Sequence, residues 1–251
     1  MSTQRYSGAT MERSEKSKVV LIPWDPNSSE HRERLYLQRV ACGWKEDMIE
    51  TWRGLQRDGK MAIQWVVLPD DDCARDSKLA HHVMQFPAEM ESILDSATSF
   101  VGFPRKLPDS PRSFIPVGHI SLDSENRDPS LADPSQGLYC ISTFYISKAL
   151  QRSGLGRAAI DSVERMAIQK PLSAKELALD TMDREYSLTV ELWKAFGAPA
   201  PTLTFIKVSN QDWYERRGYK VYKRKESYYL EKDLAGKVWH IPAVFMKKSV
   251  A

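Results

Sequence analysis

A glycine-bearing turn that joins a predicted strand to a predicted helix constrains the fold of this chain more than any other feature. The strand spans 138–146, and the helix that opens around Gly154 and Gly156 keeps its apolar residues on one face. Such a turn points backbone N–H groups outward at the positive end of the helix dipole, and glycine lets a ligand come close to the backbone. With Arg152 and Arg157 beside it, the turn predicts a site for a phosphate or pyrophosphate.

Two other interpretations of this turn stay open at the level of the sequence. It could be an ordinary strand-to-helix connection in which the glycines serve only the geometry of the turn. Residues 154–159 also fit the dinucleotide-binding fingerprint G-x-G-x-x-G/A, and Asp180 ends the next predicted strand, where a ribose-binding acid is expected. However, residues 147–153 separate the first glycine from its strand, and the preceding strands follow one another as in an antiparallel sheet. The dinucleotide interpretation therefore has the wrong local geometry.

The rest of the pattern predicts one α/β domain, of the α+β type, over residues 18–251. Residues 1–17 are rich in Ser, Thr, Arg and Glu and predict a mobile tail. Insertions are predicted at about 70–112 and 182–208, where the pattern becomes irregular. The predicted elements are a strand at 19–22, helices beginning near Asn27 and Met48, strands at 61–68, 114–122 and 138–146, the helix after the glycine turn, a strand at 176–181, a helix at 210–217, strands at 219–222, 227–230 and 238–246, and further helices near 89–94 and 186–196.

Composition narrows the class of protein. The 36 basic and 33 acidic residues nearly balance, so no charge excess predicts a nucleic-acid partner. No apolar run approaches the ~18 residues that span a bilayer, and the first residues lack a signal peptide's apolar stretch, so we expect a soluble, cytoplasmic protein without a membrane partner. Cys42, Cys73 and Cys140 lie far apart, which fits a reducing compartment and a packing role. Cys73, His81 and His82 lack a second paired-ligand motif, so no metal site is predicted.

The glycine turn and the element order together resemble the GNAT superfamily of N-acetyltransferases. Gln151, Gly154 and Gly156 match the superfamily's acyl-CoA signature Q/R-x-x-G-x-G/A, and residues 214–219 resemble its Y-x-x-x-G-F/Y motif. The similarity covers residues 114–246 well and the first predicted elements loosely. It implies a GNAT fold, in which a mixed, mostly antiparallel central sheet has a splayed strand pair and flanking helices.

The resemblance implies that acetyl-CoA binds along the strand before the turn. In proteins of this type the second half of that strand pairs its backbone with the pantetheine arm, and the turn holds the pyrophosphate through main-chain N–H groups. Asn210 stands only four residues before Tyr214, closer than the superfamily's asparagine stands to its tyrosine, so it either contacts the cofactor or caps its helix. The cofactor-binding residues implied are Phe144, Ile146, Gln151, Arg152, Ser153, Gly154, Leu155, Gly156, Arg157 and Asn210.

The resemblance also implies direct transfer of the acetyl group to a primary amine, in a complex that holds both substrates. Tyr214 takes the position of the superfamily's proton donor to the leaving thiolate, although it could instead be a packed aromatic residue. The group that takes the proton of the amine stays open. The candidates are His119, Asp123, Glu125, Asp180, Asp183 and Glu185.

The acceptor is expected to be a small-molecule amine, and the two insertions are expected to shape its site. The protein would act as a monomer or a homodimer. A regulatory module that binds acyl-CoA without turnover is the main alternative, and an NAD(P)-dependent oxidoreductase is a weaker one. The sequence does not identify the acceptor.

Overall fold

The computed structural model describes residues 17–197 and 209–251, so most of the predicted tail and residues 198–208 of the second insertion lie outside the described part of the chain. The strands of the central sheet are β1 Val20–Pro23, β2 Ile63–Val67, β7 Gly118–Asp123, β8 Leu138–Ile146, β9 Glu176–Met182, β10 Lys220–Lys232 and β11 Val238–Ser249.

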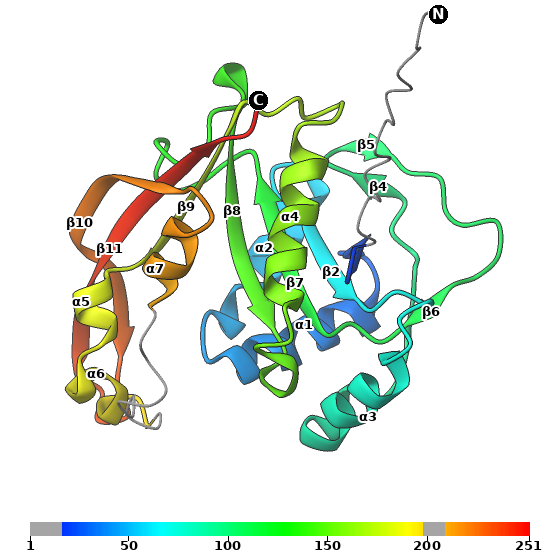
Figure 1. Cartoon of the computed structure of the whole chain (residues 1–251), viewed down its shortest axis with the longest axis horizontal. Coiled ribbons are helices and arrows are strands. Elements are labelled where there is room, and N and C mark those ends of the chain that lie inside the picture. The colour runs from blue at the N-terminus through cyan, green and yellow to red at the C-terminus, as the bar shows by residue number, and fades with distance from the viewer. Residues whose placement is uncertain (1–16, 198–208) are drawn as a thin grey trace, which may run out of the picture.

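In the described residues these strands form one seven-stranded sheet in the order β1-β2-β7-β8-β9-β11-β10 (Figure 1). Every neighbouring pair is antiparallel except β8 and β9, which are parallel. The sheet is therefore mixed and mostly antiparallel, which confirms the predicted fold class. A dinucleotide-binding fold would instead need a parallel sheet built from βαβ units.

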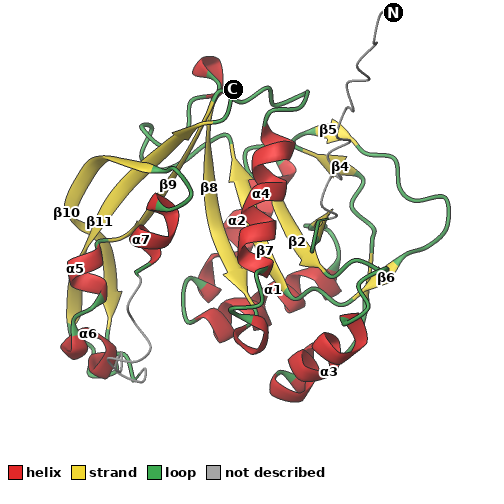
Figure 2. Ribbon diagram, viewed as in Figure 1, coloured by secondary structure: helices red, strands yellow, loops and turns green. Residues whose placement is uncertain are grey.

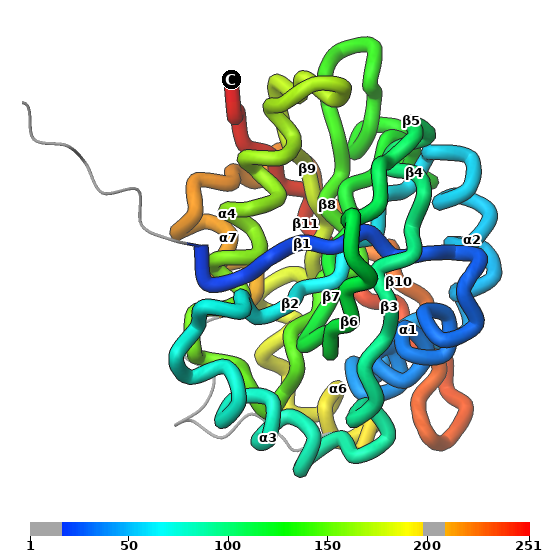
Figure 3. The backbone as a smooth tube through the Cα atoms, turned by 90° about the vertical axis from the view of Figure 1, so that its right-hand side faces the viewer, coloured from blue at the N-terminus to red at the C-terminus, as the bar shows by residue number. Residues whose placement is uncertain are grey.

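Helices flank the sheet on both faces (Figure 2). The side view in Figure 3 places α4 and α7 on one face and α1 and α2 on the other, and we call these the α4 face and the α1 face. The helices are α1 Ser29–Cys42, α2 Ile49–Arg57, α3 Arg75–Gln85, α4 Leu155–Ala167, α5 Arg184–Ser187, α6 Val190–Ala195 and α7 Asn210–Glu215.

The pattern of buried residues explains how α4 is held against the sheet. Its buried residues Leu155, Ala159 and Val163 recur at helical spacing, and they pack into one cluster with Ile141 and Leu177 of β8 and β9. On β8 and β9 the intervening residues Cys140 and Ala178 belong to a separate cluster on the α1 face. Alternate residues of both strands therefore face different layers of the protein.

The structure corrects the prediction for the first insertion. The helix expected near residues 89–94 is absent there, because 87–89 form a short 3-10 turn and β3 Ile93–Leu94 pairs with β6 Ser113–Phe114. The helix of this insertion is α3, over Arg75–Gln85. Its one fully enclosed side chain is His82, a polar residue, so the apolar periodicity that predicts amphipathic helices is weak over this segment. A small hairpin, β4 Ser99–Phe100 and β5 Phe103–Pro104, completes the insertion.

Four element boundaries also differ from those predicted. Ser28, not Asn27, caps α1 by accepting a hydrogen bond from the backbone N–H of His31. The strand predicted at 114–122 is interrupted at Pro116, which has no N–H for a sheet ladder, so β7 begins at Gly118. The helix predicted at 186–196 is divided into α5 and α6, and the strands predicted at 219–222 and 227–230 are one strand, β10, with two register irregularities.

Candidate functional site

The strands β8 and β9 part from each other after three residue pairs. Their register joins Leu138 to Glu176, Tyr139 to Leu177 and Cys140 to Ala178, and no pair beyond Cys140 is formed in the described part of the chain. β8 continues to Ile146 along β7, so its other edge has no partner strand over that length. Figure 1 shows the two strands meeting at one end and diverging towards the end at which α4 begins. The splayed pair implied by the sequence is thus present, and we call the space between the strands the split.

Main-chain groups of β8 face the split. The N–H of Ser147 donates to the carbonyl of Val117, which directs Ser147 towards β7. Because main-chain direction alternates along a strand, the N–H and C=O groups of Ile146 and Phe144 point the opposite way, towards the unpaired edge. These are the two residues that the sequence assigned to the pantetheine arm. The Ile146 carbonyl accepts a long hydrogen bond, 3.3 Å, from Nε2 of Gln151, so Gln151 ties the turn to the strand.

β8 contains a β-bulge shortly after the last residue that pairs with β9. His119 pairs with Tyr145 and Ser121 pairs with Ser142, so Thr143 and Phe144 together oppose the one residue between them on β7. Thr143 has a φ of 45°, which is rare for a β-branched residue. After the bulge, Phe144 packs with the core of the α4 face, whereas Tyr145 contacts His119 on the α1 face.

The turn before α4 leaves the start of that helix uncapped. Gly154 is the N-cap residue with a φ of 87°, and no side chain caps the helix among the described residues. The first-turn N–H groups, those of Leu155, Gly156 and Arg157, have no intrahelical acceptor and carry the positive end of the helix dipole. Ser153 is turned away from them, because its Oγ donates to the carbonyl of Leu150 at 2.5 Å. The turn can therefore offer main-chain donors to an anion.

Gly156 lies where three elements come together. A Cβ at this position would lie 3.6 Å from Cζ of Phe144, 3.8 Å from Cγ1 of Ile146 and 3.9 Å from Cζ2 of Trp213. These are ordinary contact distances, so a methyl group fits but a branched side chain does not. The second glycine of the signature thus permits α4 to approach β8 and α7 closely.

Lys18 adds a positive charge that sequence analysis did not assign to the site. Its Nζ lies 3.5 Å from where a Cβ of Gly154 would be, so the ammonium group stands directly over the turn. The side chain is exposed, as is that of Arg157, which is 3.8 Å from Asp161. Lys18 precedes β1 and is far from the signature in sequence, so no local pattern could have connected the two.

Tyr214 belongs to α7 and packs in the core cluster of the α4 face. Its ring is 9% exposed and makes edge contacts with Trp213 and Tyr219, at centroid distances of 4.9 and 5.7 Å. Burial, and then the negative charge of Asp180, raises the pKa of the Tyr214 hydroxyl, while Arg217 opposes the shift. Burial therefore keeps the hydroxyl protonated at neutral pH. Tyr214 is a packed aromatic residue whose hydroxyl retains its proton.

Asn210 does not cap its helix. Ser209 is the N-cap of α7: its side chain accepts from the N–H of Asp212, whose carboxylate in turn accepts from the N–H of Ser209. Asn210 is the exposed first residue of the helix. The capping alternative is therefore wrong, and contact with a cofactor stays a prediction.

Four of the candidate proton acceptors have other partners or lie at the surface. His119 is fully buried, its Nδ1 is 2.8 Å from Oε1 of Gln38, and burial with the nearby charge of Arg39 lowers its pKa well below the usual value. Glu125 forms an ion pair of 3.0 Å with Lys60. Asp183 caps α5 and forms an ion pair with Arg224, and Glu185 is exposed in the first turn of α5.

The remaining two candidates lie on opposite sides of Cys140. Asp123 pairs with Cys140 across β7 and β8, and Asp180 follows Ala178 on β9. Both carboxylates raise the pKa of the buried Cys140 thiol, after burial itself. Asp180 accepts a hydrogen bond from Tyr229 of β10. Both carboxylates are on the α1 face, at the end of the split.

Aromatic side chains stand near these carboxylates on the α1 face. Trp44, from the connection between α1 and α2, makes an edge contact with Tyr229 at a centroid distance of 5.9 Å. Tyr228 lies beside Tyr229, and the guanidinium of Arg127 is 3.9 Å from its ring centroid. Aromatic faces and carboxylates attract organic cations, and at Tyr228 that place is already taken by Arg127.

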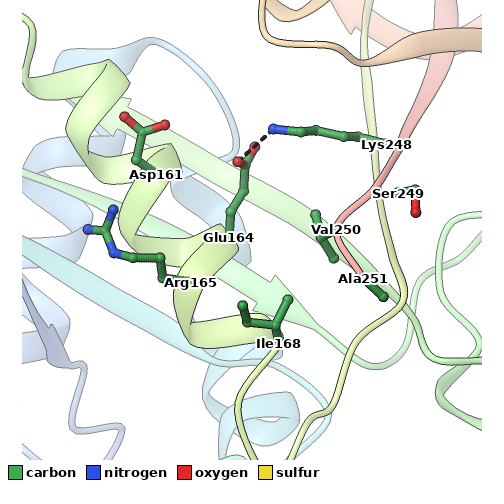
Figure 4. Close-up of a pocket in the computed structure, with 8 residues that line it drawn as sticks. All are labelled: Asp161, Glu164, Arg165, Ile168, Lys248, Ser249, Val250 and Ala251. Atoms are coloured by element: carbon green, nitrogen blue, oxygen red, sulfur yellow. Dashed lines mark hydrogen bonds and ion pairs between the residues drawn. The ribbon is translucent and has the colours of Figure 1, made fainter. Parts of the chain in front are cut away.

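A surface pocket lies at the far end of α4 from the turn. It is lined by Asp161, Glu164 and Arg165 of α4, by the C-cap residue Ile168 and by the last residues of the chain, and the ion pair between Glu164 and Lys248 crosses it (Figure 4). The residues of the signature turn do not line it. This pocket is therefore separate from the split.

The three residues considered as metal ligands differ in their exposure. Cys73 and His81 are exposed, whereas His82 is enclosed, with Nδ1 2.8 Å from Oγ of Ser147 and Nε2 3.5 Å from Oε2 of Glu89. Residues 17–197 and 209–251 contain no group of three or more His, Cys, Asp or Glu side chains placed to hold a metal ion. In the same ranges, none of the helices is long and apolar enough to cross a membrane.

Comparison with solved structures identifies the fold. A GNAT-family protein from Desulfovibrio desulfuricans superposes with a TM-score of 0.50 and 11% sequence identity, over 93% of this chain and 99% of that one. A chimera of the spermidine N-acetyltransferase SpeG from Vibrio cholerae and hSSAT gives a TM-score of 0.50 and 10% identity, over 93% and 96% of the two chains. No protein-family model matches this chain, and no curated protein matches it in sequence. The chain has a GNAT superfamily fold.

Proposed function

We propose that this protein is an N-acetyltransferase that moves an acetyl group from acetyl-CoA to a primary amine of a small molecule. The observation that carries the proposal is the unpaired edge of β8 beside the uncapped start of α4. An extended chain with alternating amide groups can add to such an edge as a further strand, and a pyrophosphate suits the helix start. Acetyl-CoA carries both features on one molecule.

In this proposal the described residues divide between the two ends of the cofactor. Main-chain groups of Phe144 and Ile146 bind the pantetheine arm. Main-chain N–H groups from Arg152 to Arg157 bind the pyrophosphate, and Lys18 adds charge above Gly154. Gln151 keeps the turn attached to the end of β8. The proposal assigns no metal to this reaction.

The chemistry is a direct attack of the amine nitrogen on the thioester carbonyl. A thiolate with an intrinsic pKa of ~8.5 leaves more readily when a proton donor is close to its sulfur. Tyr214 would supply that proton, since burial keeps its hydroxyl protonated and its neighbour Trp213 packs near Phe144 of β8. The amine would approach from the α1 face, past Trp44, Tyr229 and Asp180.

The test is a screen of the purified protein for release of free thiol from acetyl-CoA with polyamines, amino acids, arylamines, aminoglycosides and peptides. We expect turnover with a small amine, and tight binding of acetyl-CoA by calorimetry. Binding of acetyl-CoA without turnover of any acceptor would favour a regulatory module instead. A thermal shift with NAD(P) and none with acetyl-CoA would contradict the proposal and favour an oxidoreductase.

A further inference from the structure

Asp123 occupies an unusual position at the closed end of the split. It is the last residue of β7 and lies opposite Cys140, the residue at which the pairing of β8 with β9 ends. Its side chain is on the α1 face and the residue is 5% exposed. A carboxylate so deeply buried normally has a paired cation. Within residues 17–197 and 209–251, Asp123 has hydrogen bonds but forms no ion pair.

Two serine hydroxyls take the place of a cation. Ser121 Oγ donates to one oxygen of the Asp123 carboxylate, and Ser142 Oγ donates to the other. Ser121 is fully enclosed, whereas Ser142 is half-buried and directly precedes the bulge at Thr143. Of the two serines, only Ser142 retains solvent exposure.

The surroundings of Asp123 make it a base suited to neutral pH. Burial raises the pKa of its carboxyl to about 7. Four weaker influences lower this pKa: the hydroxyls of Ser121 and Ser142, the backbone of Ala62 and the charge of Lys45. From β8 the buried thiol of Cys140 faces it, and Asp180 stands on the other side of that thiol. A base with a pKa close to the working pH is partly deprotonated and still takes up a proton readily.

We propose that Ser142 and Asp123 form the proton-accepting pair of the reaction: the acceptor amine lies against Ser142 Oγ, and its proton passes through that hydroxyl to Asp123. This inference rests on the proposed acetyl transfer and identifies the group that takes the proton. It also places the amine on the α1 face, whereas Tyr214 acts from α7.

The protons balance in three steps. The ammonium group of the acceptor gives one proton to Ser142 Oγ while the hydroxyl proton of Ser142 moves to Asp123, which leaves a neutral amine. The amine nitrogen forms a bond to the carbonyl carbon, and the carbon–sulfur bond breaks as the thiolate takes the proton of Tyr214. The second proton of the new amide nitrogen returns to the tyrosinate. The net products are the amide, free CoA and one proton, which Asp123 releases to solvent.

The test compares Asp123→Asn with the wild type on two acceptors. With the best alkyl amine of the thiol-release screen we expect kcat to fall about 100-fold, because an ammonium group must lose a proton before it attacks. With hydroxylamine at pH 7, which is already neutral, we expect a fall of less than about 10-fold after subtraction of the uncatalysed reaction. A structural role for Asp123 would lower both rates alike, and that result would overturn the inference.

The pH profile gives a second readout. A base must be deprotonated, so wild-type kcat with the alkyl amine should rise with pH through the pKa of Asp123, at about 7, and then level off. Asp123→Asn should lose this rise. An unchanged profile in a variant that still binds acetyl-CoA would overturn the inference.

Matched serine variants guard against misfolding of Asp123→Asn. Ser142→Ala should lower kcat about 10-fold or more, and Ser124→Ala, whose hydroxyl donates to the carbonyls of Gly59 and Lys60 and not to Asp123, should leave kcat within about 3-fold. Equal effects of the two would contradict a relay through Ser142. The proposed function fails separately, if wild-type protein releases no thiol with any amine or does not bind acetyl-CoA.

Discussion

The α4 face and the α1 face of the split are built from different kinds of group. On the α4 face, the site consists mainly of main-chain donors on β8 and at the start of α4, within one continuous segment. On the α1 face, it consists of side chains from distant parts of the chain, such as Trp44, Asp123 and Tyr229. The main-chain site needs only glycines and a strand end, whereas the side-chain site needs particular residues at particular places. The main-chain site suits a ligand that many proteins of one fold could bind, whereas the side-chain site suits a ligand specific to one protein.

The strongest test of this division is Gly156→Val. The two methyl groups of valine would meet Phe144, Ile146 and Trp213, whose atoms already lie 3.6 to 3.9 Å from a Cβ. We expect the Kd for acetyl-CoA to rise by more than about 100-fold, since α4 must move away from β8. Calorimetry gives the Kd. The control is Gly54→Val on α2, where a Cβ meets nothing within 4 Å. If Gly156→Val bound acetyl-CoA as tightly as the wild type does, α4 would not be part of the acetyl-CoA site.

Removal of the Tyr214 hydroxyl tests the catalytic step separately from the binding of acetyl-CoA. We expect Tyr214→Phe to lower kcat about 100-fold and to leave the Kd for acetyl-CoA unchanged, because only the leaving thiolate uses the proton. Since burial raises the pKa of Tyr214, the wild type should keep its donor protonated, and kcat should not fall near pH ~10, where an ordinary tyrosine ionises. Tyr222→Phe, which removes a hydroxyl that donates to Ser130, is the control. A full kcat in Tyr214→Phe would assign the residue to packing alone.

On the α1 face, Asp180→Asn should affect the amine and not the cofactor. Loss of the carboxylate removes an attraction for the cationic acceptor, so we expect the KM of the amine to rise about 10-fold while the Kd for acetyl-CoA stays constant. Steady-state kinetics with each substrate varied in turn measure both effects. Glu125→Gln, at a surface carboxylate that pairs with Lys60, should change neither. A parallel loss of cofactor affinity in Asp180→Asn would show that the two faces are not separate.

The smallest expected effect belongs to Lys18. Its exposed ammonium group stands above Gly154, so Lys18→Ala should raise the Kd for acetyl-CoA about 3-fold at low salt and less at high salt, because ions screen exposed charges. Lys106→Ala, at an exposed lysine paired with Asp109, is the control. A loss that does not depend on salt would argue against a charge interaction.

The same division explains what the sequence could and could not predict. The signature turn, β8 and α4 are local, and their glycines and apolar spacing were sufficient to predict the turn and the helix, while the resemblance to the GNAT superfamily implied the splayed strand pair. Asp123 and the enclosed His82 are different, because the hydroxyls that contact them belong to Ser142 and Ser147, which no spacing along the chain indicates. The irregular 70–112 segment also concealed α3, whose enclosed residue is a histidine. Patterns in sequence report apolar faces and special backbone, and they do not report polar groups buried by distant contacts.

Because of the bulge at Thr143, the number of residues in β8 determines which of its side chains face each side of the sheet. Because successive residues of a strand face opposite sides, the extra residue determines that Ser142 and Tyr145 share the α1 face while Phe144 and Ile146 serve the other side. Loss of one residue here would exchange the two sets, even if every remaining amino acid were kept. Deletions and insertions within β8 should therefore be rarer over evolution than substitutions. A substitution alters one contact, whereas a shift of register changes the side chains on both faces of β8 at once.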